Sequence, residues 1–131
     1  MIMSTNIRAR RAAALAAIVI TTLGAGAWAA PFHLHLLKST PAANATVKAA
    51  PDSIQLWFSQ KPELGVTSVK VTGPGNATVA LAPLASRDSS EVVAPVKGGM
   101  KAGAYTVTWR TMAKDGHVAR GTFAFTVGGA R

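Results

Sequence analysis

The sequence predicts an all-β domain, and the architecture we expect is a sandwich of six or seven short strands. Apolar and polar side chains alternate with a period of two in several segments between residues 53 and 127. Turn-forming glycine, proline and polar residues separate these segments at short intervals, and no window after the first thirty residues has a helical period. The chain of 131 residues can bury a core for one domain but is too short for two.

Each expected strand is a run of alternating side chains that ends at a turn signal. The strands cover residues 53–59, 67–72, 77–82, 91–96, 105–111 and 121–127. A Gly-Pro-Gly-Asn turn at 73–76 ends the second strand, and the polar stretch 86–90 separates the third from the fourth. We interpret Trp57 and Trp109 as packing residues; a ligand-stacking role is the alternative. The side chains expected to face the core are Ile54, Leu56, Phe58, Val69, Val71, Tyr105, Val107, Trp109, Phe123, Phe125 and Val127.

The first 29 residues have the pattern of a secretory signal peptide. Three arginines at positions 8, 10 and 11 precede an apolar run over residues 12–23, and small residues follow. The apolar run is shorter than the ~18 residues that a membrane-spanning helix needs, although an uncleaved anchor remains the alternative. We expect cleavage after Ala29, or else after Ala27, and a mature domain of residues 30–131 in the periplasm or otherwise exported from the cytoplasm.

Composition excludes several classes of function. The chain has no cysteine, which rules out disulfides, thiolate zinc sites, iron–sulfur clusters and cysteine nucleophiles. Without residues 1–29 it has 11 basic and 5 acidic side chains, a net charge of +6. The basic residues are scattered and form no stripe with aromatic residues, so we expect no nucleic-acid binding. No Ser/His/Asp set, phosphate loop or close carboxylate pair indicates an enzyme, and we expect no catalytic residues and no organic cofactor.

The three histidines are the candidate chemical groups. His33 and His35 occupy alternate positions, which would place them on one strand face, and His117 follows Asp115 and Gly116. Two imidazoles and a carboxylate form a mixed nitrogen and oxygen donor set that suits Cu(II), although zinc accepts the same ligands. The alternative is an ordinary turn in which Asp115 caps backbone amides, Gly116 supplies a positive φ and His117 is solvated.

Several segments resemble the CopC family of exported copper-binding proteins associated with copper resistance. In that family the mature chain begins with a histidine, then has a leucine three residues later and a Ser/Thr-Pro-Ala turn, as in HLHLLKSTPA at 33–42. The strand IQLWFS at 54–59 follows the family pattern, and the C-terminal block is the most similar part. That block consists of AGAYTVTWR at 102–110, DGH at 115–117 and GTFAFTV at 121–127.

The resemblance implies an immunoglobulin-like Greek-key sandwich of about seven strands that binds one Cu(II) per chain. The family's metal ligands correspond to His33, Asp115 and His117, together with an N-terminal amine. Cleavage after Ala29 would place that amine on another residue, which makes His35 a candidate further ligand. Some family members bind Cu(I) through a methionine-rich loop, but only two methionines follow the signal, so no thioether site is expected.

The implied role is copper resistance and homeostasis, by buffering copper or delivering it to an integral membrane protein of the CopD type. We expect a monomer. Two alternatives remain open: a metal-free immunoglobulin-like interaction module, and a histidine-brace copper oxidase or monooxygenase, which would need an N-terminal amine on the ligand histidine. Thr111 and Arg120 lie near the Asp115 loop in sequence and are candidates to orient the ligands.

Overall fold

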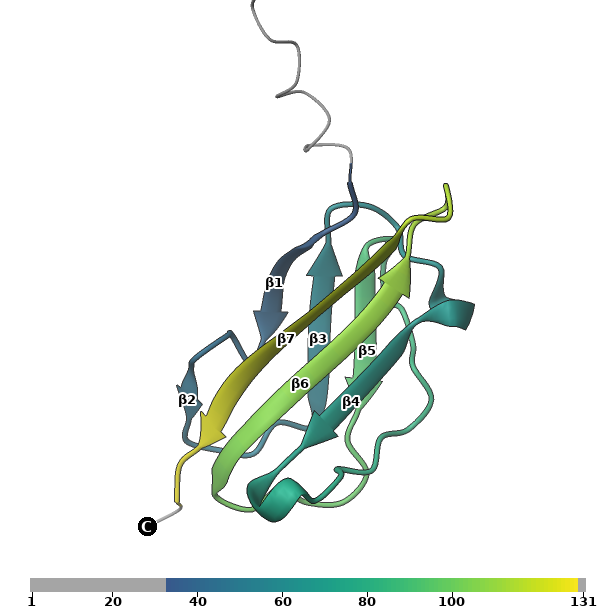
Figure 1. Cartoon of the computed structure of the whole chain (residues 1–131). Coiled ribbons are helices and arrows are strands. Elements are labelled where there is room, and N and C mark those ends of the chain that lie inside the picture. The colour runs from purple at the N-terminus through teal and green to yellow at the C-terminus, as the bar shows by residue number, and fades with distance from the viewer. Residues whose placement is uncertain (1–32, 130–131) are drawn as a thin grey trace, which may run out of the picture.

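Two β-sheets face each other in the computed structural model, which describes residues 33–129 (Figure 1). The signal peptide expected at residues 1–29 lies outside this range. Within it, seven strands form one sheet of order β1-β3-β5 and one of order β2-β7-β6-β4. All neighbours pair antiparallel except β2 and β7, which pair parallel. The strands are β1 (Leu36–Thr40), β2 (Thr46–Val47), β3 (Ser53–Phe58), β4 (Ser68–Thr72), β5 (Glu91–Pro95), β6 (Gly103–Met112) and β7 (Val118–Val127).

The alternation in the sequence accounts for the core between the sheets. Along β3 the even-numbered residues are buried, and Ile54, Leu56 and Phe58 are at most 1% exposed. The rings of Phe58 and Trp109 meet edge to face across the two sheets, with centroids 5.2 Å apart. Fully burying an aliphatic or aromatic side chain of this size contributes roughly 1.5–3 kcal/mol. The all-β prediction and the inward faces of these strands are therefore confirmed.

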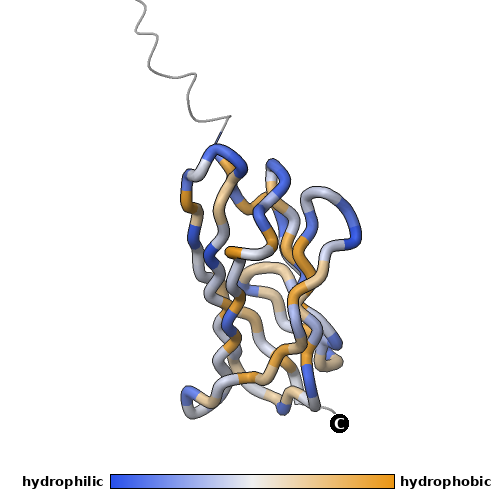
Figure 2. The backbone as a smooth tube through the Cα atoms, turned by 90° about the vertical axis from the view of Figure 1, so that its right-hand side faces the viewer, coloured by the Kyte–Doolittle hydropathy of each residue, from blue (hydrophilic) through white to orange (hydrophobic). Residues whose placement is uncertain are grey.

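The part of the chain that the structure describes contains no α-helix, in agreement with the sequence. Its only helical segments are two single 3₁₀ turns, η3 (Leu64–Val66) and η4 (Pro74–Asn76). The second of these is the predicted Gly-Pro-Gly-Asn turn, where Gly75 and Asn76 both have positive φ. Figure 2 shows hydrophilic residues in the loops at both ends of the domain, and apolar segments between them.

The prediction of a strand at 77–82 is wrong, because the structure has no strand there. This segment makes only isolated bridges, from Thr78 to Thr72 beside β4 and from Leu81 to Val96 just after β5. It therefore crosses from the edge of one sheet to the edge of the other, and no continuous run of its residues stays beside a single partner. Pro83 follows and has no amide hydrogen with which to extend the pairing.

The prediction that His33 and His35 share a strand face is also wrong, because β1 begins at Leu36. Both histidines are exposed, and Leu34 between them is buried in the core. The two tryptophans, both predicted to be packing residues, have different environments. Trp109 is a core residue, whereas Trp57 is half-buried on the outer face of its sheet, with the ammonium of Lys38 4.6 Å from its ring centroid.

Candidate metal centre

The β6–β7 hairpin holds Asp115 and His117 in a tight turn. The two strands pair along ten residues each, up to Met112 opposite Val118. The amide of Ala113 donates to the carbonyl of His117 at 2.9 Å and closes the turn. Gly116 has a φ of +90°, a conformation that a side chain would disfavour. The sequence places these residues in a loop, and the structure makes that loop shorter than the link between the predicted strand ends, because β6 extends to Met112 and β7 begins at Val118.

Within the turn, Asp115 is bound to His117 through both carboxylate oxygens. Its Oδ1 accepts the backbone amide of His117 at 3.0 Å, and its Oδ2 accepts the ring Nδ1–H at 2.8 Å. Both side chains are well exposed. The backbone amide of His117, and then its ring, hold the pKa of Asp115 below its ordinary value, so the carboxylate is ionised at neutral pH.

This contact determines which ring nitrogen of His117 can bind a metal. An ionised carboxylate only accepts hydrogen bonds, so Nδ1 carries the hydrogen. In a neutral imidazole the other nitrogen, Nε2, then has a free lone pair. A carboxylate that accepts from one nitrogen of an imidazole while the other nitrogen faces a metal is a recurrent arrangement in metalloproteins. The capped turn that the sequence offered as the alternative is therefore present, and it leaves a metal-binding nitrogen available.

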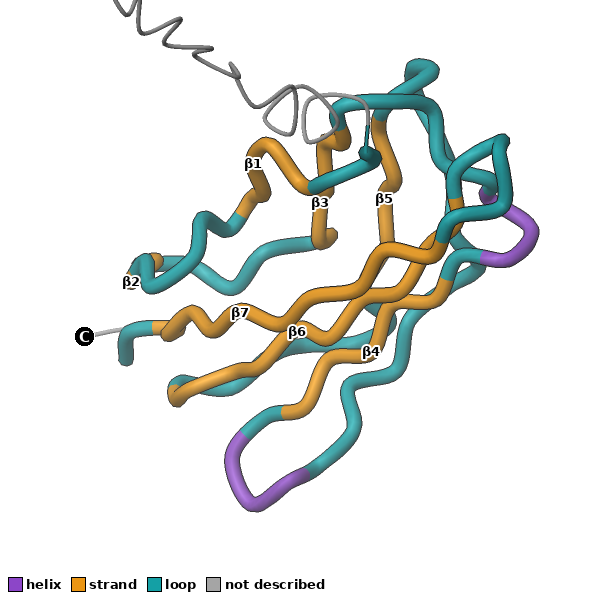
Figure 3. The backbone as a smooth tube through the Cα atoms, turned by 45° about the horizontal axis from the view of Figure 1, so that its top comes forward, coloured by secondary structure: helices purple, strands orange, loops and turns teal. Residues whose placement is uncertain are grey.

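His33 reaches the same turn from the start of the described chain. Its ring meets the ring of His117 edge to face, with centroids 5.6 Å apart and an angle of 86° between the planes. Figure 3 brings this end of the sandwich forward, with the loops drawn in teal. The structure thus places His33 against His117, and His117 against Asp115, although His33 is separated from the turn by nearly the whole domain in sequence.

Ser59 fixes the position of the histidine segment, a role that the sequence analysis did not identify. Its hydroxyl donates to the carbonyl of His33 at 3.3 Å and accepts the amide of His35 at 3.0 Å. Its own amide donates to the carbonyl of His35 at 2.9 Å. A serine at the end of a strand carries no distinctive signal in the sequence, because only the fold reveals that the N-terminal segment runs beside it.

His35 lies next to this group but has a different environment. Its Nδ1 donates to the carbonyl oxygen of His33 at 2.9 Å, since a carbonyl can only accept. Its Nε2 is then the ring nitrogen with a free lone pair. Within residues 33–129, no group of three or more histidine, aspartate or glutamate side chains is arranged so that it could hold a metal ion as it stands.

Thr111, expected to orient the ligands, serves the core instead. It is fully buried, and its hydroxyl bonds the hydroxyl of Thr67 at 2.6 Å. Thr67 already donates its hydrogen to the carbonyl of Glu63, so Thr111 is the donor of this pair. The contact links the segment between β3 and β4 to strand β6. Arg120 is exposed on β7.

The described residues include no helix that is long and apolar enough to span a membrane.

Comparison with known proteins identifies the family. The chain is 37% identical over 116 residues to Protein YobA of Escherichia coli K12, covering 87% of this chain and 91% of YobA. It is 32% identical over 109 residues to Copper resistance protein C of Escherichia coli, covering 77% and 86% of the two chains. The crystal structure of PcoC, a methionine-rich copper resistance protein from Escherichia coli, superposes with a TM-score of 0.67 at 34% identity and covers 72% of this chain and 98% of PcoC. This likeness confirms the immunoglobulin-like sandwich. Residues 36–128 match the CopC domain, and the chain therefore belongs to the CopC domain family.

Proposed function

We propose that the mature chain is an exported copper-binding protein that holds one Cu(II) and contributes to copper resistance. Membership of the CopC domain family supports a role connected with copper, and relatives of this length are named copper resistance proteins. The ion is the cargo of the protein. The role that we propose is that of a binding protein rather than an enzyme.

One observation carries the proposal: the edge-to-face contact between His33 and His117 beside the Asp115 carboxylate. Two exposed imidazoles have no packing reason to meet at a hairpin turn. Together with the carboxylate they form the nitrogen and oxygen donor set that Cu(II) prefers, and Cu(II) heads the affinity order for such sites. The low pKa of Asp115 keeps a negative charge beside the incoming cation.

Each residue has a separate role in this proposal. His117 supplies Nε2, the nitrogen that its bond to Asp115 leaves free, and His33 supplies a second ring nitrogen. Asp115 orients His117 and offers a carboxylate lone pair to the ion. His35 is a candidate further ligand through Nε2.

The remaining steps concern location and delivery. We propose that residues 1–29 are a signal peptide removed after Ala29, which leaves the mature domain at 30–131 as a monomer in the periplasm or otherwise outside the cytoplasm. The domain would then buffer Cu(II) or pass it to an integral membrane partner of the CopD type. The exposure of Asp115 and His117 supports transfer, because a partner could reach the ion directly.

The direct test is a Cu(II) titration of the processed protein against a chromophoric competing chelator. We expect one ion per chain, and at least a tenfold loss of affinity in His33→Ala and in His117→Ala. Asp52→Asn is the matched control, because Asp52 is an exposed carboxylate before β3, away from the turn. Intact mass spectrometry of the secreted protein gives the cleavage site, expected to correspond to residues 30–131.

Correctly processed protein that takes up no stoichiometric copper would contradict the proposal. The domain would then be better described as a metal-free interaction module.

A further inference from the structure

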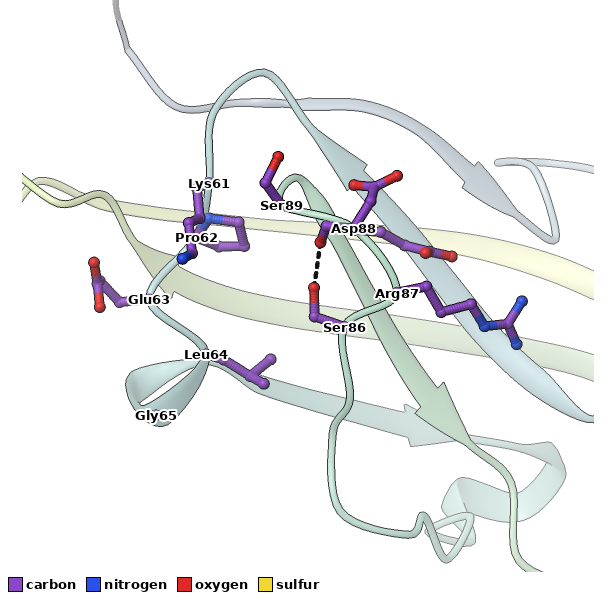
Figure 4. A pocket seen from close by; sticks show the side chains of 10 residues that line it. Lys61, Pro62, Glu63, Leu64, Gly65, Ser86, Arg87, Asp88 and Ser89 are labelled. Atoms are coloured by element: carbon purple, nitrogen blue, oxygen red, sulfur yellow. Dashed lines mark hydrogen bonds between the residues drawn. The ribbon is translucent and has the colours of Figure 1, made fainter.

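A second polar site lies at the same end of the sandwich as the candidate metal centre. It is a cleft of about 580 Å³ between the segment after β3, residues 61–65, and the loop before β5, residues 86–89 (Figure 4). The side chain of Leu64 points into the space between these two segments. Glu91, the first residue of β5, also lines the cleft.

Glu91 is a buried acid without a partner. The residue is only 4% exposed. In the described part of the chain, its carboxylate has neither a hydrogen bond nor an ion pair, and the single ion pair there joins His117 and Asp115. Every polar side-chain atom that is fully shut off from solvent does have a hydrogen-bond partner. The carboxylate of Glu91 must therefore reach open space, and the cleft is the space that it lines.

Nearby groups do not neutralise this charge. Lys61 and Arg87 line the same cleft, yet neither forms an ion pair with Glu91, and the guanidinium of Arg87 extends away from Lys61 in Figure 4. The hydroxyl of Ser86 donates to the carbonyl of Asp88. Asp88 in turn accepts the amide of Ser90 at 2.8 Å. A buried carboxylate without a counter-charge is unfavourable, so the cleft is suited to a cationic group.

The cleft also concentrates the few acidic residues of a basic protein. Of the five aspartates and glutamates in a chain with a net charge of +9, three line it: Glu63, Asp88 and Glu91. Asp115 lies at the same end of the molecule, on the hairpin that the cleft wall adjoins. With Lys61 and Arg87 also in the lining, acidic side chains outnumber basic ones here by three to two, in contrast to the chain as a whole.

An exposed apolar side chain beside the cleft favours a polypeptide over a small cation. Val66, 46% exposed, follows Gly65 in the cleft wall. The side chain of Leu64 also lines the cleft. A partner chain could cover Val66 while a side chain of its own entered the cleft.

Backbone contacts connect the cleft wall to the metal-binding hairpin. Pro62 forms a β-bridge with Ala113, and the amide of Glu63 donates to the carbonyl of Met112 at 2.9 Å. Ala113 is two residues before Asp115. A molecule seated in the cleft would therefore lie beside the candidate copper ligands.

We propose that this cleft is the docking site for an arginine or lysine side chain of a partner polypeptide, whose cationic group pairs with Glu91 while a flanking apolar residue covers Val66. The inference does not depend on copper binding, because none of the candidate ligands lines the cleft.

The test is an NMR titration of the metal-free mature protein with the blocked peptide acetyl-Ala-Leu-Arg-Leu-Ala-amide. We expect saturable amide shifts confined to residues 61–66 and 86–91. The same peptide with citrulline, a neutral analogue of arginine, should bind at least tenfold more weakly. Glu91→Gln keeps the shape of the side chain and removes its charge, and it should weaken binding of the arginine peptide by a similar factor.

Two further variants make the test specific. Arg87→Ala removes a competing cation from the cleft and should strengthen binding a few-fold. Asp52→Asn, far from the cleft, should leave binding unchanged. A spectrum of native dispersion for each variant establishes that it is folded.

Three results would overturn the proposal: no binding of the arginine peptide at millimolar concentration, equal binding of the citrulline peptide, or equal binding to Glu91→Gln. Acetyl-arginine-amide carries the cationic group without flanking residues, so it distinguishes a site for small cations from a docking site for a polypeptide. If it bound as tightly as the peptide, the cleft would be a site for small cations and docking of a polypeptide would be rejected.

Discussion

Asp115 has two functions that a single substitution does not separate. Its carboxylate directs the Nε2 of His117 outward, and it places a negative charge beside the proposed ion. The first function needs a hydrogen-bond acceptor at the right position, whereas the second needs the charge itself. Comparing two substitutions of different character distinguishes them.

We expect Asp115→Ala to lower Cu(II) affinity by about 10- to 100-fold, the range found when partners of ligand histidines are removed. Asp115→Asn keeps a carbonyl oxygen that can accept from His117 but carries no charge. It should retain more affinity than alanine if orientation dominates, and as little as alanine if the charge dominates. Competitive titration measures both variants, with Asp52→Asn as the control. Wild-type affinity in Asp115→Ala would remove Asp115 from the site.

The pH dependence of copper binding should follow the histidines rather than Asp115. Imidazole must be neutral to bind a metal, and an unperturbed histidine titrates near pH ~6.5. Binding should therefore weaken as pH falls through this range, be mostly lost by about pH 4.5, and release protons when copper is added. Titrations at several pH values in buffers of different ionisation enthalpy measure both effects. Equal affinity at pH 7 and pH 5 would contradict histidine ligation.

Asp115 does not contribute to the pH dependence in that window. Because hydrogen bonds from His117 depress its folded-state pKa, its contribution to stability is present above its unfolded-state pKa and is lost only as pH falls through the still lower folded-state value. Because the folded-state pKa of Asp115 lies below its ordinary value, the carboxylate stays charged between pH 5 and pH 7.

Among the elements, the β6–β7 hairpin supports the candidate site and depends on one close contact. Gly121 on β7 faces Trp109 on β6, and a Cβ atom at Gly121 would lie 2.6 Å from the indole ring. The indole is buried against Phe58, so it has little room to move. Glycine is needed here because of its size, since its backbone is extended as in any strand.

We expect Gly121→Ala to destabilise the domain by about 1–3 kcal/mol, as overpacking of a filled core does. Gly65→Ala is the matched control, because no atom lies within 4 Å of a Cβ at that position and its φ is ordinary. The control should change stability by less than about 0.5 kcal/mol. Urea unfolding followed by tryptophan fluorescence measures both variants. Equal stability of the two would mean that the indole can shift at no cost.

The elements also show what the sequence could predict. Apolar and polar side chains alternate in 53–59, 105–111 and 121–127 because each strand has one solvent-exposed and one buried face. Those strands form where they were expected. The segment 77–82 has similar composition but fails as a strand, because its pairing depends on where two sheet edges lie in space. Local sequence carries no information on that position.

The sequence supplied the candidate ligands but not their geometry. The resemblance to the CopC family named His33, Asp115 and His117, and the fold places His33 and Asp115 each against His117, while metal binding by them stays a prediction. The hydrogen bond that fixes the tautomer of His117 could be identified only in the folded structure. The same holds for the contacts of Ser59. Glu91 could not be selected from the sequence, since its burial results from a loop and a strand that meet only after folding.

For the whole molecule, the distribution of charge matters more than its total. The chain carries a net charge of +9, yet four of its five acidic residues lie at the end that holds the histidines and the cleft. This end also carries two exposed valines. Lys61 and Arg87 line the same cleft and Lys114 precedes Asp115, so this end carries charges of both signs, while the rest of the surface is mainly basic. The proposed copper site and the proposed docking site both rely on the acidic side chains of this end.

The measurement that tests the central claim most directly is pulsed electron paramagnetic resonance of the mature protein loaded with one equivalent of Cu(II). Couplings to the remote imidazole nitrogen count the histidines bound to the ion. We predict a tetragonal spectrum with at least two coordinated imidazoles, one fewer in His117→Ala and one fewer in His33→Ala. Unchanged couplings in both variants would show that copper binds elsewhere, and the site at the β6–β7 turn would have to be abandoned.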